Sequence, residues 1–133
     1  MKYCPVCNCE QEILLVQKRE TYLVKGEPFT IDATVCTCAH CGEEIMTDEY
    51  DDDNLRKAYA KYRTRHGLLQ PEEIKAIRES YGISQVAFAR IVGEEDNAIA
   101  RYENGSLQTK AANDRIMLAR DHKNFLLLKQ RNT

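Results

Sequence analysis

The stretch Cys4-Pro5-Val6-Cys7 and the later stretch Cys38-Ala39-His40-Cys41 together predict the fold of the N-terminal part of the chain. Two residues between the cysteines of each pair let a tight turn aim both sulfurs at one ion. Four thiolates form the ligand set of a closed tetrahedral zinc site. We therefore expect one structural Zn²⁺ per chain, held by Cys4, Cys7, Cys38 and Cys41. A filled tetrahedron leaves no position for a catalytic water.

Two further cysteines leave alternatives open. Cys9 and Cys36 offer CxC spacings with Cys7 and Cys38, but the CxxC pairs suit a metal better, so we interpret these two as neighbouring thiols. Iron in a rubredoxin-like site is the main rival metal, because four thiolates suit it as well. A disulfide pair is the metal-free alternative. His40 lies inside a CxxC pair, and we expect it to face solvent.

The residues between the two cysteine pairs alternate with a period of two. Tyr22 and Val24 form one apolar run, and Phe29, Ile31, Ala33 and Val35 form a second. Lys25-Gly26-Glu27-Pro28 separates the runs. This pattern predicts a β-hairpin that brings the cysteine pairs together.

From Asp51 the apolar period becomes helical, with a stripe made of Leu55, Ala58, Tyr59 and Tyr62. The acidic start of this helix and its basic end complement the helix dipole. Gly67 ends the helix, and Pro71 opens the next one. We therefore predict an α+β protein with two domains. Residues 1–66 would form a zinc-ribbon hairpin domain that ends in a helix, and residues 67–133 would form an all-helical domain.

Five short helices are expected after Pro71, roughly at 71–80, 84–91, 97–103, 109–119 and 122–130. Residues 74–105 have the layout of a repressor-type helix-turn-helix. Ser84 is suited to cap the second of these helices, and Gln85 can reach a DNA phosphate beside free backbone N–H groups. Gly93 makes the turn.

The helix over 97–103 is expected to read DNA. Ile99 and Tyr102 would point inward, so Asn97, Ala98 and Arg101 would point outward. Asparagine can bond adenine through two hydrogen bonds, and arginine can do the same to guanine in the major groove. The alternatives are that Asn97 only caps the helix and that Arg101 is a solvated surface residue.

A further expectation is an ion pair between Arg78 and Glu103 that ties the first helix of the motif to the end of the reading helix. The predicted DNA-binding residues are therefore Ser84, Gln85, Asn97, Ala98 and Arg101. The predicted ligand is double-stranded DNA.

The net charge of −2 conceals a gradient along the chain. Residues 1–50 hold four Lys and Arg against nine Asp and Glu, whereas residues 54–133 hold fifteen against nine. The acidic part would repel phosphate and suits a protein partner, while the basic part can approach DNA. Only three residues precede the first cysteine, which leaves no room for a signal peptide, so we expect a cytoplasmic protein. No apolar run exceeds four residues, so we expect that the chain does not span a membrane.

No constellation of catalytic residues stands out, and the metal site is expected to be closed, so the sequence gives no support for an enzyme. The three histidines, His40, His66 and His122, are scattered along the chain.

Taken together, the chain resembles the MqsA/YgiT-type antitoxins, which join a zinc ribbon to a helix-turn-helix in this order. The resemblance spans nearly the whole chain and is carried by three segments: Cys4-Pro5-Val6-Cys7, Cys38-Ala39-His40-Cys41 with Glu44-Ile45-Met46, and Asn97 to Gly105. It departs from the family pattern at Cys9 and Cys36, and at Leu107-Gln108-Thr109, where prolines are expected.

The resemblance implies a homodimer formed by the C-terminal domain. This dimer would bind a palindromic operator of its own operon, with Asn97 and Arg101 at base edges, and the zinc domain would bind a protein toxin. The resulting hypothesis is an antitoxin and transcriptional repressor of a toxin-antitoxin operon. The alternative is a stand-alone zinc-ribbon and helix-turn-helix regulator without a toxin partner.

Overall fold

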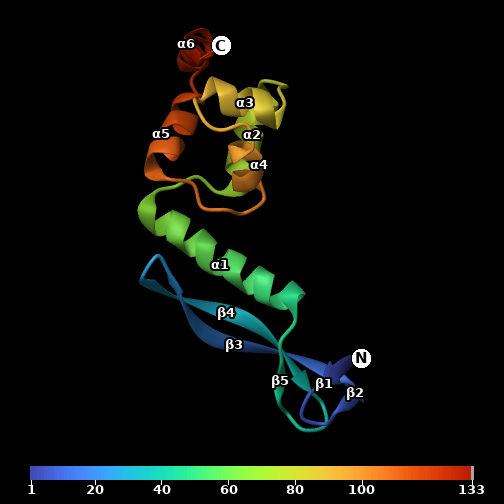
Figure 1. Cartoon of the computed structure of the whole chain (residues 1–133). Helices are drawn as coiled ribbons and strands as arrows, with labels where there is room; N and C mark the ends of the chain where they lie inside the picture. Colours follow the sequence, from blue (N-terminus) through green and yellow to red (C-terminus); the bar gives the residue numbers. More distant parts are fainter. Residues whose placement is uncertain (133) are drawn as a thin grey trace. The chain divides into compact units, whose positions relative to one another are not determined.

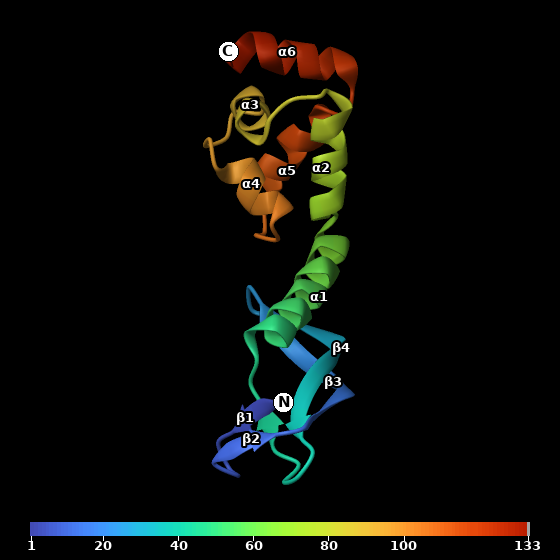
Figure 2. The same cartoon turned by 90° about the vertical axis from the view of Figure 1, so that its right-hand side faces the viewer.

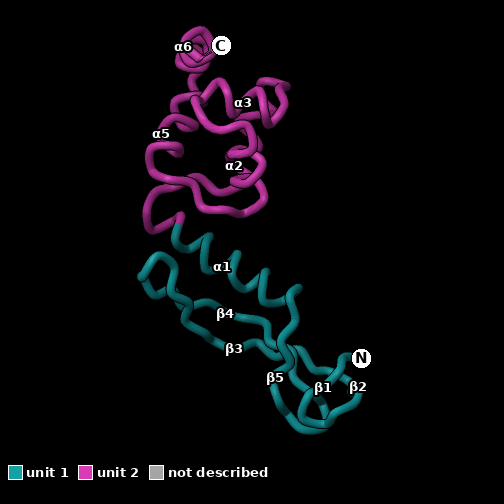
Figure 3. Tube along the Cα trace, in the orientation of Figure 1, with its two compact units in different colours: residues 1–62 teal, residues 63–133 magenta. Residues whose placement is uncertain are grey.

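The computed structural model describes residues 1–132. The chain divides into two compact units, Met1–Tyr62 and Arg63–Thr133 (Figure 3). Unit 1 contains five strands and most of a long helix, and unit 2 contains five short helices. The α+β class expected from the sequence is confirmed.

Unit 1 is built on a long β-hairpin. Strands β3 (Ile13–Val24) and β4 (Glu27–Cys38) pair antiparallel along their whole length, and β5 (Glu44–Ile45) adds to the far side of β4 (Figure 1). A second small sheet pairs β1 (Lys2–Cys4) with β2 (Cys9–Gln11). The predicted hairpin between the cysteine pairs is thus confirmed.

The turn of the hairpin is shorter than expected. Only Lys25 and Gly26 lie outside the strands, with φ angles of 51° and 81°, while Glu27 and Pro28 already belong to β4. Two successive residues with positive φ form the turn type whose twist matches a hairpin. Pro28 is tolerated because its position, next to a hydrogen-bonded closing pair, requires no N–H toward β3.

Helix α1 (Asp48–His66) begins three residues earlier than the period change at Asp51 suggested. Ala58 is fully buried, but Leu55 is 40% exposed, so the expected apolar stripe is wrong at this position. The buried face instead runs through Asn54, one residue earlier. Tyr62 meets Phe29 edge-on, with ring centroids 5.9 Å apart.

The alternation in β4 also changes phase. Phe29, Ile31 and Ala33 are buried as expected, but Val35 is only half-buried, and the buried positions then move to Cys36 and Cys38. The cysteine end of the strand therefore buries the opposite face from the end beside α1.

Side chains of α1 occupy the outer edge of β4 beyond the short β5. The amide of Asn54 bonds both backbone groups of one residue, and two lysines reach the carbonyls of the next alternate residues. These contacts are Thr34 N–H to Asn54 Oδ1 (2.9 Å), Asn54 Nδ2 to Thr34 O (2.8 Å), Lys57 Nζ to Asp32 O (2.9 Å), and Lys61 Nζ to Thr30 O. Asn54 therefore bonds both backbone groups of Thr34, as a neighbouring strand would, while the two lysines, which can only donate, satisfy the carbonyls of Asp32 and Thr30.

Unit 2 packs five helices around one apolar core. They are α2 (Pro71–Ser80), α3 (Gln85–Ile91), α4 (Ala98–Glu103), α5 (Lys110–Leu118) and α6 (His122–Asn132) (Figure 2). Each lies within two residues of its expected bounds. Ile74, Phe88, Ile99 and Ile116 are completely buried in this core. Within residues 1–132, none of the helices combines the length and apolar character needed to cross a bilayer.

Polar side chains fix the start and the end of the helix-turn-helix region. Asn113 Oδ1 accepts the backbone N–H of Leu69 at 2.8 Å, and Gln108 Nε2 donates to the carbonyl of Leu69 at 2.8 Å. Arg63 donates to the carbonyl of Gly105 at 2.8 Å. Thr109 caps α5 by accepting the N–H of Ala112, so this helix start is built without the prolines expected there.

Candidate metal centre and nucleic-acid interface

The four CxxC cysteines converge at one end of unit 1. Their sulfurs all lie within 4.8 Å of one another, with Cys4 Sγ 3.5 Å from Cys41 Sγ and Cys7 Sγ 3.9 Å from Cys38 Sγ. Tetrahedral zinc with Zn–S bonds of about 2.3 Å separates its sulfurs by about 3.8 Å. These four residues are therefore close enough to bind one metal ion, and their spacing fits a tetrahedral site.

Each cysteine pair lies on a tight turn closed by its own backbone. The N–H of Asn8 donates to the carbonyl of Cys4 at 2.8 Å, and the N–H of Gly42 donates to that of Cys38 at 2.9 Å. Gly42 adopts a φ of 78°, which favours glycine. The turn geometry that CxxC spacing predicts is thus present in both cysteine pairs, the one before β3 and the one after β4.

The thiols of the cluster differ in their electrostatic surroundings. Hydrogen bonds from backbone N–H groups, first that of Cys41 and then that of His40, lower the pKa of Cys38 to about 6 against the effect of burial. Burial raises the pKa of Cys7 to about 12, and the neighbouring thiols add to this increase. A bound cation favours deprotonated thiols, so metal binding would release protons here.

The remaining two cysteines lie outside the cluster. Cys36 is buried opposite Ile45 of β5, while Cys9 is exposed and accepts a hydrogen bond from Gln11. His40 is exposed and is not among the converging ligand atoms.

In unit 2, α3 and α4 form the helix-turn-helix pair. Ser84 is the N-cap of α3, and its hydroxyl accepts the N–H of Ala87 at 3.1 Å. Gln85 is half-buried, and its amide donates to Glu103 at 3.3 Å rather than standing free at the surface. A phosphate contact by Gln85 would therefore have to share or replace this bond.

Helix α4 presents two of the three predicted side chains outward. Asn97 and Arg101 are exposed, and Asn97 occupies the N-cap position without making a side-chain cap hydrogen bond. Ala98 is only 1% exposed, so the expectation that it points outward is wrong. The buried stripe of this helix is wider than Ile99 and Tyr102 alone, because Ala98 lies one turn before Tyr102 and shares its face.

Arg78 and Glu103 form the expected ion pair. Arg78 Nε lies 2.8 Å from Glu103 Oε2 and Nη2 lies 3.0 Å from Oε1, and both side chains are largely buried. A third bond runs from Arg78 to the carbonyl of Ile83. These contacts connect α2, the start of α3 and the end of α4.

Two further arginines hold the turn between α3 and α4, and the sequence reasoning missed both. Arg90 makes a two-point contact with Asp96, with distances of 3.0 and 2.9 Å, and this pair lowers the pKa of Asp96. Arg115 of α5 bonds the carbonyl of Val92 and the carboxylate of Glu94. Their partners lie on other elements, so periodicity within one helix gave no signal for them.

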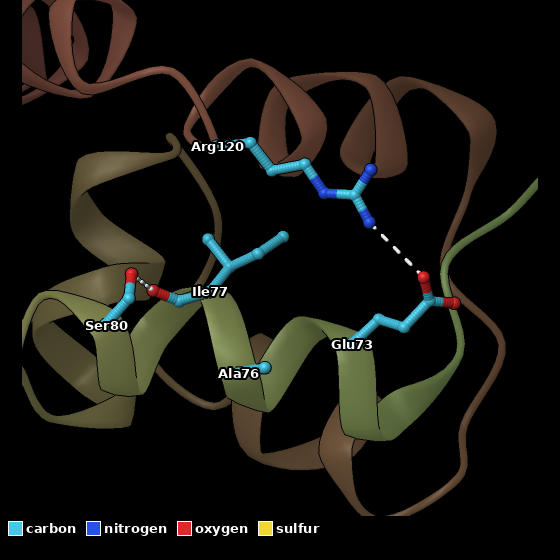
Figure 4. Close-up of a pocket in the computed structure, with 5 residues that line it drawn as sticks. All are labelled: Glu73, Ala76, Ile77, Ser80 and Arg120. Carbon is cyan, nitrogen blue, oxygen red and sulfur yellow. Dashed lines mark hydrogen bonds and ion pairs between the residues drawn. The ribbon is translucent and has the colours of Figure 1, made fainter.

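An open hollow of about 330 Å³ lies beside α2. Glu73, Ala76, Ile77, Ser80 and Arg120 line it, and Arg120 reaches across to Glu73 at 3.2 Å (Figure 4). The two charged groups of this hollow already pair with each other. It therefore offers no unpaired charge to a ligand.

The fold and these two sites define a small protein with a helix-turn-helix and a cluster of four cysteines close enough together to hold a metal ion. The family model described as the antitoxin component of bacterial toxin-antitoxin systems, MqsA, matches residues 1–129. This chain belongs to that family of antitoxins. Membership of the family implies that the chain has a toxin partner.

A curated relative adds a local similarity. Antitoxin PezA of Streptococcus pneumoniae serotype 4 is 46% identical over 35 residues, which is 26% of this chain. The match covers only 22% of the length of PezA, so it supports an antitoxin relationship for one segment and not for the whole relative.

Proposed function

We propose that this protein is an antitoxin that also represses its own operon by binding DNA through unit 2. The observation that carries the proposal is that Asn97, the N-cap of α4, and Arg101, four residues later within α4, are both exposed. Side chains at this spacing lie on one face of a helix. Arg78 and Glu103 hold that helix in place through a buried ion pair.

The chemistry of the two exposed residues suits base reading. Asparagine can bond the N6 and N7 edge of adenine, and arginine can bond O6 and N7 of guanine. The amide of Asn97 is not engaged in capping its helix. Arg101 extends beside the ring of Tyr102, with its guanidinium carbon 5.9 Å from the ring centroid.

We assign phosphate binding to the start of α3. Ser84 fixes the first turn by accepting the N–H of Ala87, and Gln85 stands at the first helical position, whose backbone N–H has no acceptor within the helix. The basic excess over residues 54–133 supports approach to DNA. Ala98 has no part in the proposed interface because it is buried.

We also propose a homodimer formed by unit 2, which would match a palindromic operator. Met117, Leu118, Leu126 and Leu127 are exposed apolar side chains on α5 and α6. Exposed apolar side chains that form a contiguous surface are typical of an interface. The mass of the DNA-free protein in sedimentation tests this part of the proposal.

The proposed metal is a structural Zn²⁺ bound by Cys4, Cys7, Cys38 and Cys41. Four thiolates and a sulfur spacing near that of tetrahedral zinc support it. Because all four positions would be filled by protein, we assign no catalytic role to the metal. A reducing cytoplasm would keep these thiols available as ligands.

We propose that the domain of residues 1–66 binds the toxin and that the domain of residues 67–133 binds DNA. The acidic balance of residues 1–50 supports this division, because it would repel phosphate and suits a basic protein.

The experiment that tests the repressor function is DNase protection of the region upstream of this chain's own gene. The zinc-loaded full chain should protect a symmetric segment with two half-sites about one helical turn, or a multiple of it, apart. A scrambled duplex of the same composition serves as the control. Equal affinity for both duplexes would contradict sequence-specific repression.

A further inference from the structure

The two long edges of the β3–β4 hairpin differ in how their backbone groups are satisfied. The outer edge of β4 pairs first with β5, and beyond it Asn54 of α1 bonds both backbone groups of Thr34. Lys57 and Lys61 of α1 then donate to the next two outward carbonyls, those of Asp32 and Thr30. β3 is the edge strand on the other side, with twelve residues and no neighbouring strand within residues 1–132.

The hairpin turn determines which groups of β3 face outward. A two-residue turn is closed by a hydrogen-bonded pair, here Val24 with Glu27, and hydrogen-bonded and non-hydrogen-bonded pairs alternate from there. The even-numbered residues of β3 therefore bond β4. The N–H and C=O groups that point to the free edge belong to the odd-numbered residues of β3, which are Ile13, Leu15, Gln17, Arg19, Thr21 and Leu23.

This phase agrees with the contacts on β4. Thr30, Asp32 and Thr34, which receive the side chains of α1, are the residues whose backbone groups point away from β3 in the same alternation. The outward groups of β3 have no such partners in the described part of the chain.

Two segments of β3 carry no charge, Ile13–Gln17 and Thr21–Val24. The first has three consecutive exposed apolar side chains, whereas in the second only Leu23 is exposed and apolar, because Tyr22 is half-buried and Val24 is buried. Leu14, Leu15 and Val16 are 56%, 51% and 41% exposed, and no charged residue occurs between Ile13 and Gln17. The middle of the strand carries Lys18 and Arg19, which pair with Glu44 and Asp32. Charged side chains protect an edge against added strands, whereas an exposed uncharged segment accepts one.

We propose that the toxin adds a β-strand to β3 along Ile13–Gln17, bonding the outward backbone groups of Leu15 and Gln17 and covering Leu14 and Val16. The inference rests on the proposed role of residues 1–66 in toxin binding and specifies where that binding occurs. In this mode main-chain hydrogen bonds supply affinity, and alternate side chains supply specificity.

Charge decides which occupant fits this edge. Residues 1–62 carry seven Lys and Arg against twelve Asp and Glu, and Glu10 and Glu12 stand just before the uncharged segment. A second copy of the chain would bring the same negative balance to the interface. A basic toxin strand with alternating apolar residues is complementary in both charge and pattern.

Proline at one outward position tests the proposal with little disturbance of the hairpin. The N–H of Leu15 points to the free edge, so Leu15→Pro removes a donor for the toxin while the β3–β4 hydrogen bonds remain. Thr21→Pro is the matched control, because its N–H points to the same edge beyond the charged residues. The probe is the product of the reading frame adjacent to this gene, titrated against the zinc-loaded full chain.

We expect Leu15→Pro to weaken toxin binding about tenfold or more, and Thr21→Pro to change it less than twofold, since a lost hydrogen bond and its neighbours are worth roughly a factor of ten. Zinc content and binding to the upstream DNA report whether each variant is folded. If both variants fold and bind the toxin equally well, the strand addition is wrong, while toxin binding by residues 1–66 stands.

Amide hydrogen exchange on the unsubstituted chain gives a second measurement that needs no substitution. Toxin should slow exchange at Leu15 and Gln17 and leave Thr21 unchanged. If the toxin binds with full affinity but does not slow amide exchange at Leu15, the proposed binding site on β3 is wrong, while toxin binding by residues 1–66 stands. Failure of the unsubstituted chain to bind the toxin would overturn the proposed function with it, and loss of self-association in Leu15→Pro would identify a second copy as the occupant.

Discussion

The guanidinium of Arg78 holds the carboxylate of Glu103 through two hydrogen bonds of 2.8 and 3.0 Å, with side-chain exposures of only 14% and 7%. The pair connects the first helix of unit 2 to the last residue of α4. Because Glu103 also accepts a bond from Gln85, one carboxylate positions both the proposed phosphate-binding and base-reading helices.

Glu103→Ala should reduce the free energy of unfolding of unit 2 by about 3 kcal/mol, because it leaves the Arg78 guanidinium buried without its partner. Denaturant unfolding followed by helical circular dichroism measures the loss. Arg90→Ala is a matched control, since the Arg90–Asp96 pair has similar geometry but lies exposed at the surface. It should cost less than about 1 kcal/mol. Equal losses in the two variants would contradict the assigned importance of burial.

Asn54→Ala should destabilise unit 1 by about 2 kcal/mol, because the N–H and C=O of Thr34 then lose their partner. Amide exchange at Thr34 measures the change locally and should accelerate sharply. Lys57→Ala, which removes an exposed donor from the same edge, should leave exchange at Thr34 unchanged. Unaltered exchange at Thr34 in Asn54→Ala would show that the Asn54 amide does not satisfy this edge.

How far the sequence predicts this structure depends on whether the signal is local. The cysteine spacing, the hairpin, the five helices of unit 2 and the cap at Ser84 each depend on residues close together in the chain, and each is present. The burial of Asn54 and Gln108 was not predicted, because their partners lie 20 and 39 residues away.

The errors in the prediction also arise from contacts between residues that are distant in the sequence. Ala98 and Leu55 were assigned from helical periodicity, which gives the spacing of a face but not its width or centre. The core around Ile99 is wide enough to include Ala98, and the edge of β4 draws Asn54 rather than Leu55 into contact. Tertiary packing therefore determines which residues of each helix are buried, and the helical period alone does not.

Purified protein should contain one zinc per chain, measured by elemental analysis. Cys38→Ser should lose the metal and unfold the hairpin of unit 1, since metal binding and folding are coupled in small zinc modules. Cys9→Ser is the control and should keep one zinc, because Cys9 lies outside the cluster. Metal content near zero, or iron in aerobically purified protein, would argue against zinc.

The zinc-loaded fragment of residues 1–66 should bind the product of the adjacent reading frame, and the fragment of residues 67–133 should not. The acidic balance of the N-terminal part is the reason. Co-purification of each folded fragment measures the difference, with circular dichroism as the check on folding. Capture by the C-terminal fragment alone would reverse the assignment of the domains.

The most direct test of the account is Arg101→Ala titrated against the upstream DNA and a scrambled duplex at one fixed salt concentration, because phosphate contacts make affinity salt-dependent. Gln85→Ala is measured in parallel and should weaken binding to both duplexes by similar factors, as expected for a phosphate contact. Arg101→Ala should cost about 1–3 kcal/mol on the upstream DNA, relax the preference at one base pair per half-site, and leave the scrambled duplex nearly unaffected. Equal weakening of both duplexes by Arg101→Ala would show that Arg101 binds the DNA backbone and that α4 does not read the sequence through this residue.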